Sequence, residues 1–195
     1  MFDIILASKS KVRLDILNKN NVVCSAKPSN VDEDEIKISM LKDGASPKDV
    51  SKNLAEIKAN KVSQNNLDKI VIGADSVIDL ENEIISKPKN RSEALEILRK
   101  LNGKTHFLIS SVCISKNGSM IWNYTDRSEL KMKNLSDKEL KSYLNEIKTE
   151  TLLAYGVYQI EAGGLHLFEY IKGDKDSIMG LPVKQIKEYV KNYKL

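Results

Sequence analysis

Cysteine, arginine, aromatic residues and long apolar runs are all scarce in this chain of 195 residues. Its two cysteines, Cys24 and Cys113, are far apart and form neither a metal-binding nor a redox motif. No apolar run approaches the ~20 residues of a membrane-spanning helix. The segment from Met1 to Leu6 is strand-like and lacks the basic start of a signal peptide. We therefore expect a protein of the reducing cytoplasm with no membrane partner.

The basic residues are almost all lysines, and the formal net charge is only +4. The arginines are Arg13, Arg91, Arg99 and Arg127. A solvated, lysine-rich surface explains this balance better than a groove for nucleic acid, so nucleic acid is not an expected partner. With 41% hydrophobic and 30% charged residues, the chain has the composition of a globular protein with a sizeable core. We expect one domain over residues 1–195, formed either as one body or as two tightly joined lobes.

Segments typical of strands alternate with segments typical of helices along the chain. Strand-like sequence occupies residues 2–7, 22–26, 70–78, 105–115, 120–131 and 167–171, with a hairpin turn at Asn117-Gly118. Helix starts are marked by Ser10, by Ser46 before a proline, by Asn90, by Ser136 and by Pro182. Residues 29–45 are polar and acidic, which is typical of a loop or a loose helix. The alternation predicts an α/β fold in which helices pack on a mixed sheet.

The strand-like segment from Ile70 to Ile78 is unusual because it contains a carboxylate. Its other residues are mostly apolar, glycine or alanine, so the segment is expected to be buried on both faces. Strand alternation places Asp75 on the same face as Val71, Gly73 and Val77. A buried carboxylate is costly unless a cation or a hydrogen-bond donor meets it. Asp75 is therefore a candidate for holding Mg²⁺ or activating a water molecule.

Hydroxyl and cationic side chains gather between the first strand and the first helix. Ser8, Ser10 and Arg13 lie there, together with two lysines. Cations at a helix N-terminus oppose the helix dipole, at a cost of roughly 0.3–1 kcal/mol each. A bound phosphate would reverse that effect, because it accepts from free backbone N–H groups, hydroxyls and basic side chains. The alternative is an ordinary capped helix whose lysines extend into water.

Two lysines could supply the cation that Asp75 needs. Helical spacing stacks Lys58 with Leu54 and Val62 on one apolar stripe, so its ammonium group either snorkels to the surface or reaches an internal anion. A turn at residues 81–83 and a short return strand would bring Lys87 back near the end of the Asp75 strand. A pairing of Asp75 with Lys87 fits a metal or phosphate site and fits a structural ion pair equally well.

Weaker signals come from three other places. The acidic run from Asp32 to Glu35 is typical of a solvent-exposed surface, although one of its carboxylates could bind a metal ion. The glycines between Gly156 and Gly164 would allow a ligand to approach the backbone closely. The two histidines, His106 and His166, are isolated and receive no role.

Taken in order, the motifs resemble those of the Maf family, the septum-formation-inhibitor-like nucleotide pyrophosphatases. The matching motifs are Leu6-Ala7-Ser8-x-Ser10-x-x-Arg13, Asp32-Glu33, Leu54-Ala55-x-x-Lys58-Ala59, Gly73-Ala74-Asp75-Ser76, Lys87-Pro88, Leu101-x-Gly103-x-x-His106 and Gly180-Leu181-Pro182. The resemblance covers nearly the whole chain. It implies a Maf/inosine-triphosphatase-like fold, with a mixed twisted sheet flanked by helices, a central cleft and often a homodimer.

The same resemblance implies hydrolysis of a nucleoside triphosphate to the monophosphate and pyrophosphate, with a divalent cation such as Mg²⁺ or Mn²⁺. Asp75 resembles the general base of the family, and Glu33 resembles a ligand of the metal or of the substrate. The groups that resemble the phosphate-binding residues are Ser8, Ser10, Arg13, Lys58 and Lys87. Attack of water on the α-phosphorus fits this set, since cations must neutralise phosphate oxygens while one carboxylate orients the water.

The sequence departs from the family pattern at one motif, and at a second position it carries a residue that differs between family members of different substrate type. Lys11-Val12 stands where the family usually has proline and arginine, which removes one bidentate fork. At Glu161, members that hydrolyse thymidine and uridine triphosphates tend to have glutamine, whereas members of the 7-methyl-GTP type tend to have glutamate. The Gly73-Ala74-Asp75-Ser76 segment resembles the pyrimidine-type group instead. The expected substrate is therefore dTTP or UTP, or a modified nucleotide such as 7-methyl-GTP, and Glu161 is expected to contact its nucleobase.

A protein that binds nucleotide or nucleic acid without turnover, and acts on cell division through a partner, is the alternative. The two hypotheses differ in one measurable respect, since only the enzyme releases pyrophosphate from a triphosphate in the presence of Mg²⁺. A phosphotransferase is the weakest candidate because the chain lacks a Walker-type phosphate loop.

Overall fold

The computed structural model describes residues 3–160 and 163–192, which divide into two compact units. Unit 1 takes the described residues of Met1–Ser76, Ile109–Arg127 and Asp174–Leu195. Unit 2 takes those of Val77–Leu108 and Ser128–Gly173. Within these described ranges, no helix is both long and apolar enough to cross a membrane.

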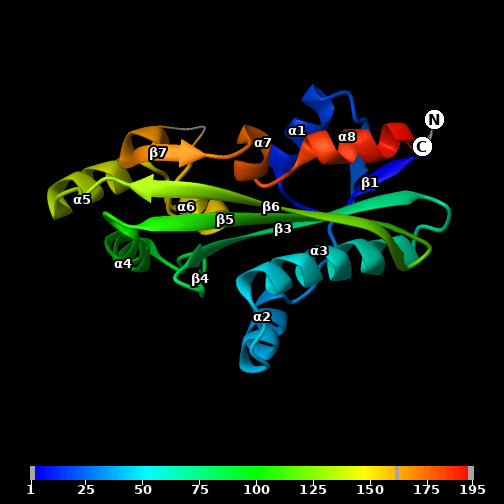
Figure 1. The fold of residues 1–195 in the computed structure, drawn as a ribbon, viewed down its shortest axis with the longest axis horizontal. Helices are drawn as coiled ribbons and strands as arrows, with labels where there is room; N and C mark the ends of the chain where they lie inside the picture. The colour runs from blue at the N-terminus through cyan, green and yellow to red at the C-terminus, as the bar shows by residue number, and fades with distance from the viewer. Residues whose placement is uncertain (1–2, 161–162, 193–195) are drawn as a thin grey trace. The chain divides into compact units, whose positions relative to one another are not determined.

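The strands form one sheet in which both parallel and antiparallel neighbours occur (Figure 1). They are β1 (Ile4–Leu6), β2 (Cys24–Ala26), β3 (Ile70–Leu80), β4 (Glu83–Ile85), β5 (Thr105–Lys116), β6 (Ser119–Met132) and β7 (Phe168–Lys172). Their order is β2-β1-β3-β5-β6-β7, and β4 pairs with β3 off this path. The β1 strand is parallel to β2 and β3, whereas β4 runs antiparallel to β3 and β7 antiparallel to β6. The predicted α/β fold with a mixed sheet is confirmed.

Side-chain caps define most of the helix starts that the sequence predicts. The helices are α1 (Lys11–Lys19), α2 (Glu33–Lys42), α3 (Pro47–Gln64), α4 (Arg91–Leu101), α5 (Asp137–Glu146), α6 (Thr149–Tyr155), α7 (Lys175–Ile178) and α8 (Val183–Asn192), with a 3₁₀ turn at Gly164–Leu167. Ser10, Ser46, Asn90 and Ser136 each accept a hydrogen bond from a backbone N–H in the first turn of their helix. The polar stretch before Ser46 contains α2, a helix without a buried residue, so the loose helix rather than the loop is correct.

Unit 1 buries the two faces of its part of the sheet under different helices (Figure 1). One face carries Leu6, Ile72 and Ala74, and it packs against α1 and α8. The opposite face carries Val71 and Ala7, and it packs against Ala55, Ala59 and Val62 of α3. Because successive strand residues point to opposite faces, Asp75 belongs to the face that α3 covers. The predicted burial of this strand on both faces is confirmed.

Unit 2 is built around a separate apolar core. Its members come from the end of β3, from β4, β6 and β7 and from helices α4, α5 and α6, with Leu98, Leu130, Met132 and Leu167 fully buried. The β3–β4 connection turns at Glu81 and Asn82, which have φ angles of 55° and 68°. This is the turn and short return strand that the sequence predicts.

Candidate active site

Asp75 lies in the unit 1 part of β3 and is only 4% exposed. Its neighbour on the same face, Gly73, touches α3 so closely that an added Cβ would lie 2.2 Å from the Ala55 carbonyl oxygen. Glycine is therefore required at this position for the helix to lie so near the strand. The close approach brings the side chains of α3 to Asp75.

Lys58 of α3 extends to Asp75 and joins it to a second carboxylate. The Lys58 Nζ atom lies 2.7 Å from Asp75 Oδ1 and 2.9 Å from Glu33 Oε1 at the start of α2. Because Lys58 is only 5% exposed, it reaches an internal anion and does not snorkel to the surface. Two carboxylates share one ammonium group here, so within the cluster of Asp75, Lys58 and Glu33 the charge of Lys58 offsets only one of the two carboxylates.

The second oxygen of Asp75 is an acceptor that the described protein atoms leave unused. Asp75 Oδ2 is buried, and no described group donates a hydrogen bond to it. A buried carboxylate oxygen normally has a partner, so this atom suits a water molecule or a metal ion. The described residues contain no cluster of three or more acidic, histidine or cysteine ligands. Magnesium does not require one, because it is often held by one or two carboxylates together with water and substrate phosphates.

The loop after β1 presents hydroxyl groups at the start of α1. Ser8 Oγ accepts from the Ser10 backbone N–H at 3.1 Å, and Ser10 Oγ caps the helix by accepting from the Arg13 N–H at 3.3 Å. Both serines are partly exposed. The capped helix is therefore present, and each hydroxyl still carries its own hydrogen, which it could donate to an anion.

Arg13 points from α1 to the same stretch of β3. Its guanidinium group donates to the Ala74 carbonyl at 2.9 Å, to Ser76 Oγ at 3.2 Å and to the Gly180 carbonyl at 2.9 Å. Burial lowers the pKa of Arg13, while the charges of Asp75 and Glu33 act in the opposite direction. Arginine remains charged over the whole physiological range. Arg13 therefore places a permanent positive charge beside the acidic cluster.

Buried hydroxyl groups of β5 and α3 surround the same segment, and the sequence did not reveal them. Ser51 Oγ of α3 donates to the Asp75 carbonyl at 3.2 Å and lies 2.9 Å from Ser111 Oγ. Ser76 Oγ lies 2.9 Å from Ser110 Oγ. The sequence signal was the pair Ser110-Ser111 inside the otherwise apolar run 107–114, and alternation sends these two side chains to opposite faces.

The family model of Maf-like proteins matches residues 3–193, which is nearly the whole chain. The chain belongs to the Maf family. It is 62% identical to a protein of Pelagibacter ubique (strain HTCC1062) named nucleoside triphosphate pyrophosphatase, over 97% of each chain. It is also 42% identical to a protein of Bartonella quintana (strain Toulouse) named 7-methyl-GTP pyrophosphatase, over 92% of this chain and 90% of that one. The resemblance inferred from the ordered motifs is confirmed.

Among solved structures, the chain is similar to a nucleoside-triphosphatase / dITP/XTP pyrophosphatase from Mycobacterium abscessus. The match covers 97% of this chain and 93% of that one, with 13% sequence identity and a TM-score of 0.45. A likeness of this degree carries no information about the reaction or the substrate.

Lys87 and Glu161 are the two expected site residues of this Maf protein that unit 1 does not contain. Lys87 follows β4 in unit 2, where it is exposed and its Nζ donates to the Ala154 carbonyl at 2.7 Å. The cation that contacts Asp75 within unit 1 is Lys58. Glu161 lies outside the described residues. Gln159, two residues earlier in the sequence, is buried, and its side chain donates to the Thr151 carbonyl at 3.5 Å.

His106, which belongs to one of the Maf motifs, is a core residue of unit 2. Its ring is fully buried, and Nε2 lies 3.0 Å from the hydroxyl oxygen of Tyr158. Burial lowers the pKa of His106 to about 4, so the ring is neutral at pH 7.

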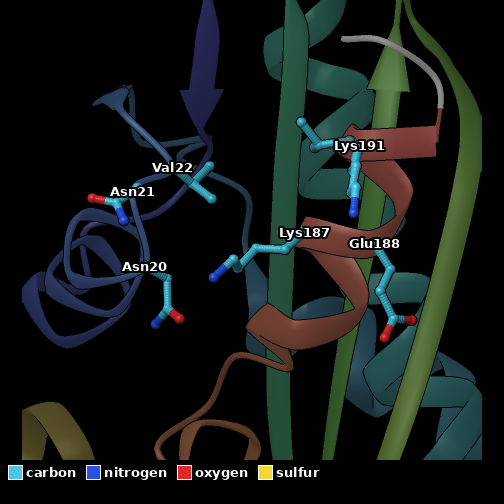
Figure 2. A pocket seen from close by; sticks show the side chains of 7 residues that line it. Asn20, Asn21, Val22, Lys187, Glu188 and Lys191 are labelled. Carbon is cyan, nitrogen blue, oxygen red and sulfur yellow. The ribbon is translucent and has the colours of Figure 1, made fainter.

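A cavity of about 410 Å³ lies between the end of α1 and α8 in unit 1 (Figure 2). Its lining residues are Asn20, Asn21, Val22, Lys187, Glu188, Val190 and Lys191. Lys187 extends across the cavity toward Asn20, whereas Glu188 points away from it (Figure 2). None of the expected site residues lines this cavity, so it is distinct from the Asp75 cluster.

Proposed function

We propose that this protein hydrolyses a nucleoside triphosphate to the nucleoside monophosphate and pyrophosphate. The observation that carries the proposal is the state of Asp75, a buried carboxylate whose Oδ1 is held by Lys58 and whose Oδ2 has no donor among the described groups. The names of the relatives from Pelagibacter ubique and Bartonella quintana support the same reaction class. Maf-family membership favours the enzyme over a binding protein without turnover.

In the proposed reaction Asp75 is the general base. Its free oxygen accepts a proton from a water molecule as the water oxygen bonds to the α-phosphorus. The bond between the α-phosphorus and the bridging oxygen breaks, and pyrophosphate leaves with the electron pair. Lys58 holds the other carboxylate oxygen, so the base keeps one orientation while its second oxygen works.

Phosphate binding is assigned to hydroxyl and cationic groups. The proposed groups are Ser8, Ser10, Arg13, Lys58 and Lys87. The two serines offer hydroxyl donors at the N-terminus of α1, which favours negative charge. The positive charges of Arg13 and Lys58 lie beside Asp75 and would offset the charge that develops on the leaving pyrophosphate.

A divalent cation, Mg²⁺ or Mn²⁺, fits the donor set of Asp75 and Glu33. The carboxylates of Asp75 and Glu33, which share Lys58, are the hard oxygen ligands that these ions prefer. When bound with the substrate, the cation would neutralise phosphate charge. We further propose a cytoplasmic homodimer and a base contact from Glu161, with the substrate either a pyrimidine triphosphate or 7-methyl-GTP.

The test is hydrolysis of dTTP, UTP, CTP, GTP and 7-methyl-GTP by the purified chain with Mg²⁺ in ¹⁸O-labelled water. Pyrophosphate release is expected, with the label in the monophosphate because water attacks the α-phosphorus. Label in pyrophosphate or orthophosphate would contradict the assigned site of attack. Binding without turnover across all five nucleotides would overturn the proposal and support the non-catalytic alternative.

A further inference from the structure

The guanidinium group of Arg13 is bonded to the strand that carries the proposed base. Two of its acceptors, the Ala74 carbonyl at 2.9 Å and Ser76 Oγ at 3.2 Å, belong to the residues on either side of Asp75. The third is the Gly180 carbonyl at 2.9 Å. An arginine has five N–H donors, and these bonds commit one on each of its three nitrogens to the protein itself.

The Arg13–Ala74 bond lies where the strand would otherwise lose its neighbour. The β1–β3 ladder pairs Leu6 with Ile72, and the Ala7 N–H donates to the Ile72 carbonyl. In a parallel pair, carbonyl groups two residues apart face the same neighbouring strand. The next carbonyl on this edge is that of Ala74, and Arg13 donates to it. Arg13 thus continues the ladder beside Asp75 after β1 has ended.

The glycine at residue 180 is required by this arrangement. Gly180 has a φ angle of +98°, and an added Cβ would lie 3.3 Å from Ser76 Oγ and 3.4 Å from Arg13 Nε. A larger residue would be strained and would crowd both partners. The motif Gly180-Leu181-Pro182 therefore gains a physical role, since its first carbonyl orients Arg13.

We propose that Arg13 is a positioning residue, which acts on the reaction by fixing Ala74 and Ser76 so that the Asp75 carboxylate keeps its orientation. This inference rests on the proposed function of Asp75 and changes the expected role of Arg13, which is otherwise a phosphate ligand. The two roles make different demands on the side chain. A phosphate ligand needs a positive charge, whereas this position needs a planar fork that reaches three acceptors at once.

The test compares Arg13→Lys and Arg13→Met with the wild-type chain. If Arg13 positions Asp75, both variants lose about 10- to 100-fold in kcat, because small misplacement of a reacting group has effects of this size. KM for the triphosphate and Kd for inorganic pyrophosphate should stay within about threefold of the wild type, because a positioning residue does not bind the phosphate groups. A threefold change corresponds to under 1 kcal/mol of binding free energy. Gly180→Ala should shift kcat in the same direction by a smaller factor. Lys19→Met, which removes an exposed charge from the last turn of α1, is the matched control and should change none of these constants.

A phosphate ligand would behave differently. If Arg13→Lys keeps wild-type kcat while Arg13→Met raises KM and the pyrophosphate Kd by tenfold or more, the positioning role is overturned. Should Arg13→Met fail to fold, the kcat values of Arg13→Lys and Gly180→Ala decide. A loss of kcat in both variants supports the positioning role, and wild-type kcat in both overturns it.

Failure of the proposed function is separable from failure of this inference. If the wild-type chain hydrolyses no triphosphate, amide hydrogen exchange of Ala74, Asp75 and Ser76 still measures the restraint. Faster exchange at these three amides in Arg13→Lys than in Lys19→Met supports the restraint that the inference requires. Equal exchange in the two variants overturns it.

Discussion

The two units bury polar groups in different ways, and the two aspartates of β3 show the difference. Asp75 in unit 1 and Asp79 in unit 2 are 4% and 6% exposed, respectively. Asp79 Oδ1 accepts from the Asn82 N–H at 2.9 Å, within the turn that immediately follows its strand. Asp75 is instead met by a cation from a distant helix and keeps one oxygen without a described donor. Burial alone therefore does not distinguish the two aspartates, whereas a long-range cation and an unused acceptor do.

The difference between the two aspartates is tested most directly by the same substitution, aspartate to asparagine, at both positions. Asp75→Asn should lower kcat by about 10²- to 10⁴-fold, the usual contribution of a general base, because an amide cannot accept the proton. Asp79→Asn keeps an oxygen that can accept from Asn82, so kcat should stay within about twofold. Pyrophosphate release under saturating triphosphate and Mg²⁺ measures both.

Circular dichroism and thermal unfolding provide the control that both variants are folded. Retention of activity in Asp75→Asn would remove the proposed base. An equal loss in Asp79→Asn would show that burial of a carboxylate in β3, rather than its partners, governs turnover.

Removal of the cation should have the next largest effect. Lys58→Met leaves the buried Asp75 without its partner, and breaking a buried ion pair in this way costs about 3–5 kcal/mol of folding stability. We expect kcat/KM to fall by about 10²-fold, as for the loss of an oriented electrostatic contact. Urea unfolding and steady-state kinetics measure the two effects.

Lys48→Met removes an exposed lysine from the first turn of the same helix and serves as the control. If Lys58→Met were no less stable and no less active than Lys48→Met, the Lys58–Asp75 contact would have no energetic importance, and the comparison between the units would fail.

Much of the fold was predictable because the signals are local. The serine and asparagine caps at Ser10, Ser46, Asn90 and Ser136 each form with a residue in the next turn, so short-range sequence determines them. The Asn117-Gly118 turn has positive φ angles at both residues and joins β5 to β6, as predicted. The short helices α6 and α7 carry too few residues for a periodic pattern and were not predicted.

The site was predictable in its residue types and less so in its pairings. Asp75 and Lys58 were each conspicuous because a charge interrupted an apolar pattern. The sequence left open whether Lys58 snorkels to the surface or reaches an internal anion. Its contact with Asp75 depends on how closely α3 approaches β3 at Gly73, which is a tertiary property. Periodicity likewise could not show that Arg13 would direct three donors at the protein itself. The chemical roles of the site residues stay predictions.

In unit 2, the pH dependence of the unfolding free energy tests whether His106 is held as a buried neutral group. Burial lowers the pKa of His106 to about 4, whereas an unfolded histidine titrates near 6.5. Between these values the unfolded chain binds a proton that the folded chain does not, so stability is lost as the pH falls below 6.5. From pH 7.5 to pH 5 this linkage should remove about 2 kcal/mol of unfolding free energy.

Urea unfolding at the two pH values measures the loss, with His106→Leu as the reference that lacks the titrating group. The pH 5 limit avoids the range in which Asp137, whose pKa the Arg99 pair lowers to about 2, loses its contribution. Equal pH dependence in the wild type and His106→Leu would mean that unit 2 does not hold His106 as a buried neutral group.

The smallest effect is expected at Glu33, the exposed member of the acidic cluster. Its side chain is 43% exposed, and it shares Lys58 with Asp75, so solvent weakens its interactions relative to those of Asp75. If Glu33 also helps to hold the metal, Glu33→Gln should raise the Mg²⁺ concentration for half-maximal activity by about tenfold, as substitutions around metal sites commonly do. Calorimetric titration with Mn²⁺ measures the metal affinity of the same variant without turnover. Glu35→Gln, in the same first turn of α2, is the control.

An unchanged metal affinity in Glu33→Gln would reduce this residue to an ion-pair partner of Lys58 and leave Asp75 as the sole proposed ligand. In that case the unused oxygen of Asp75, rather than the acidic pair, would distinguish this end of β3 from the Asp79 end.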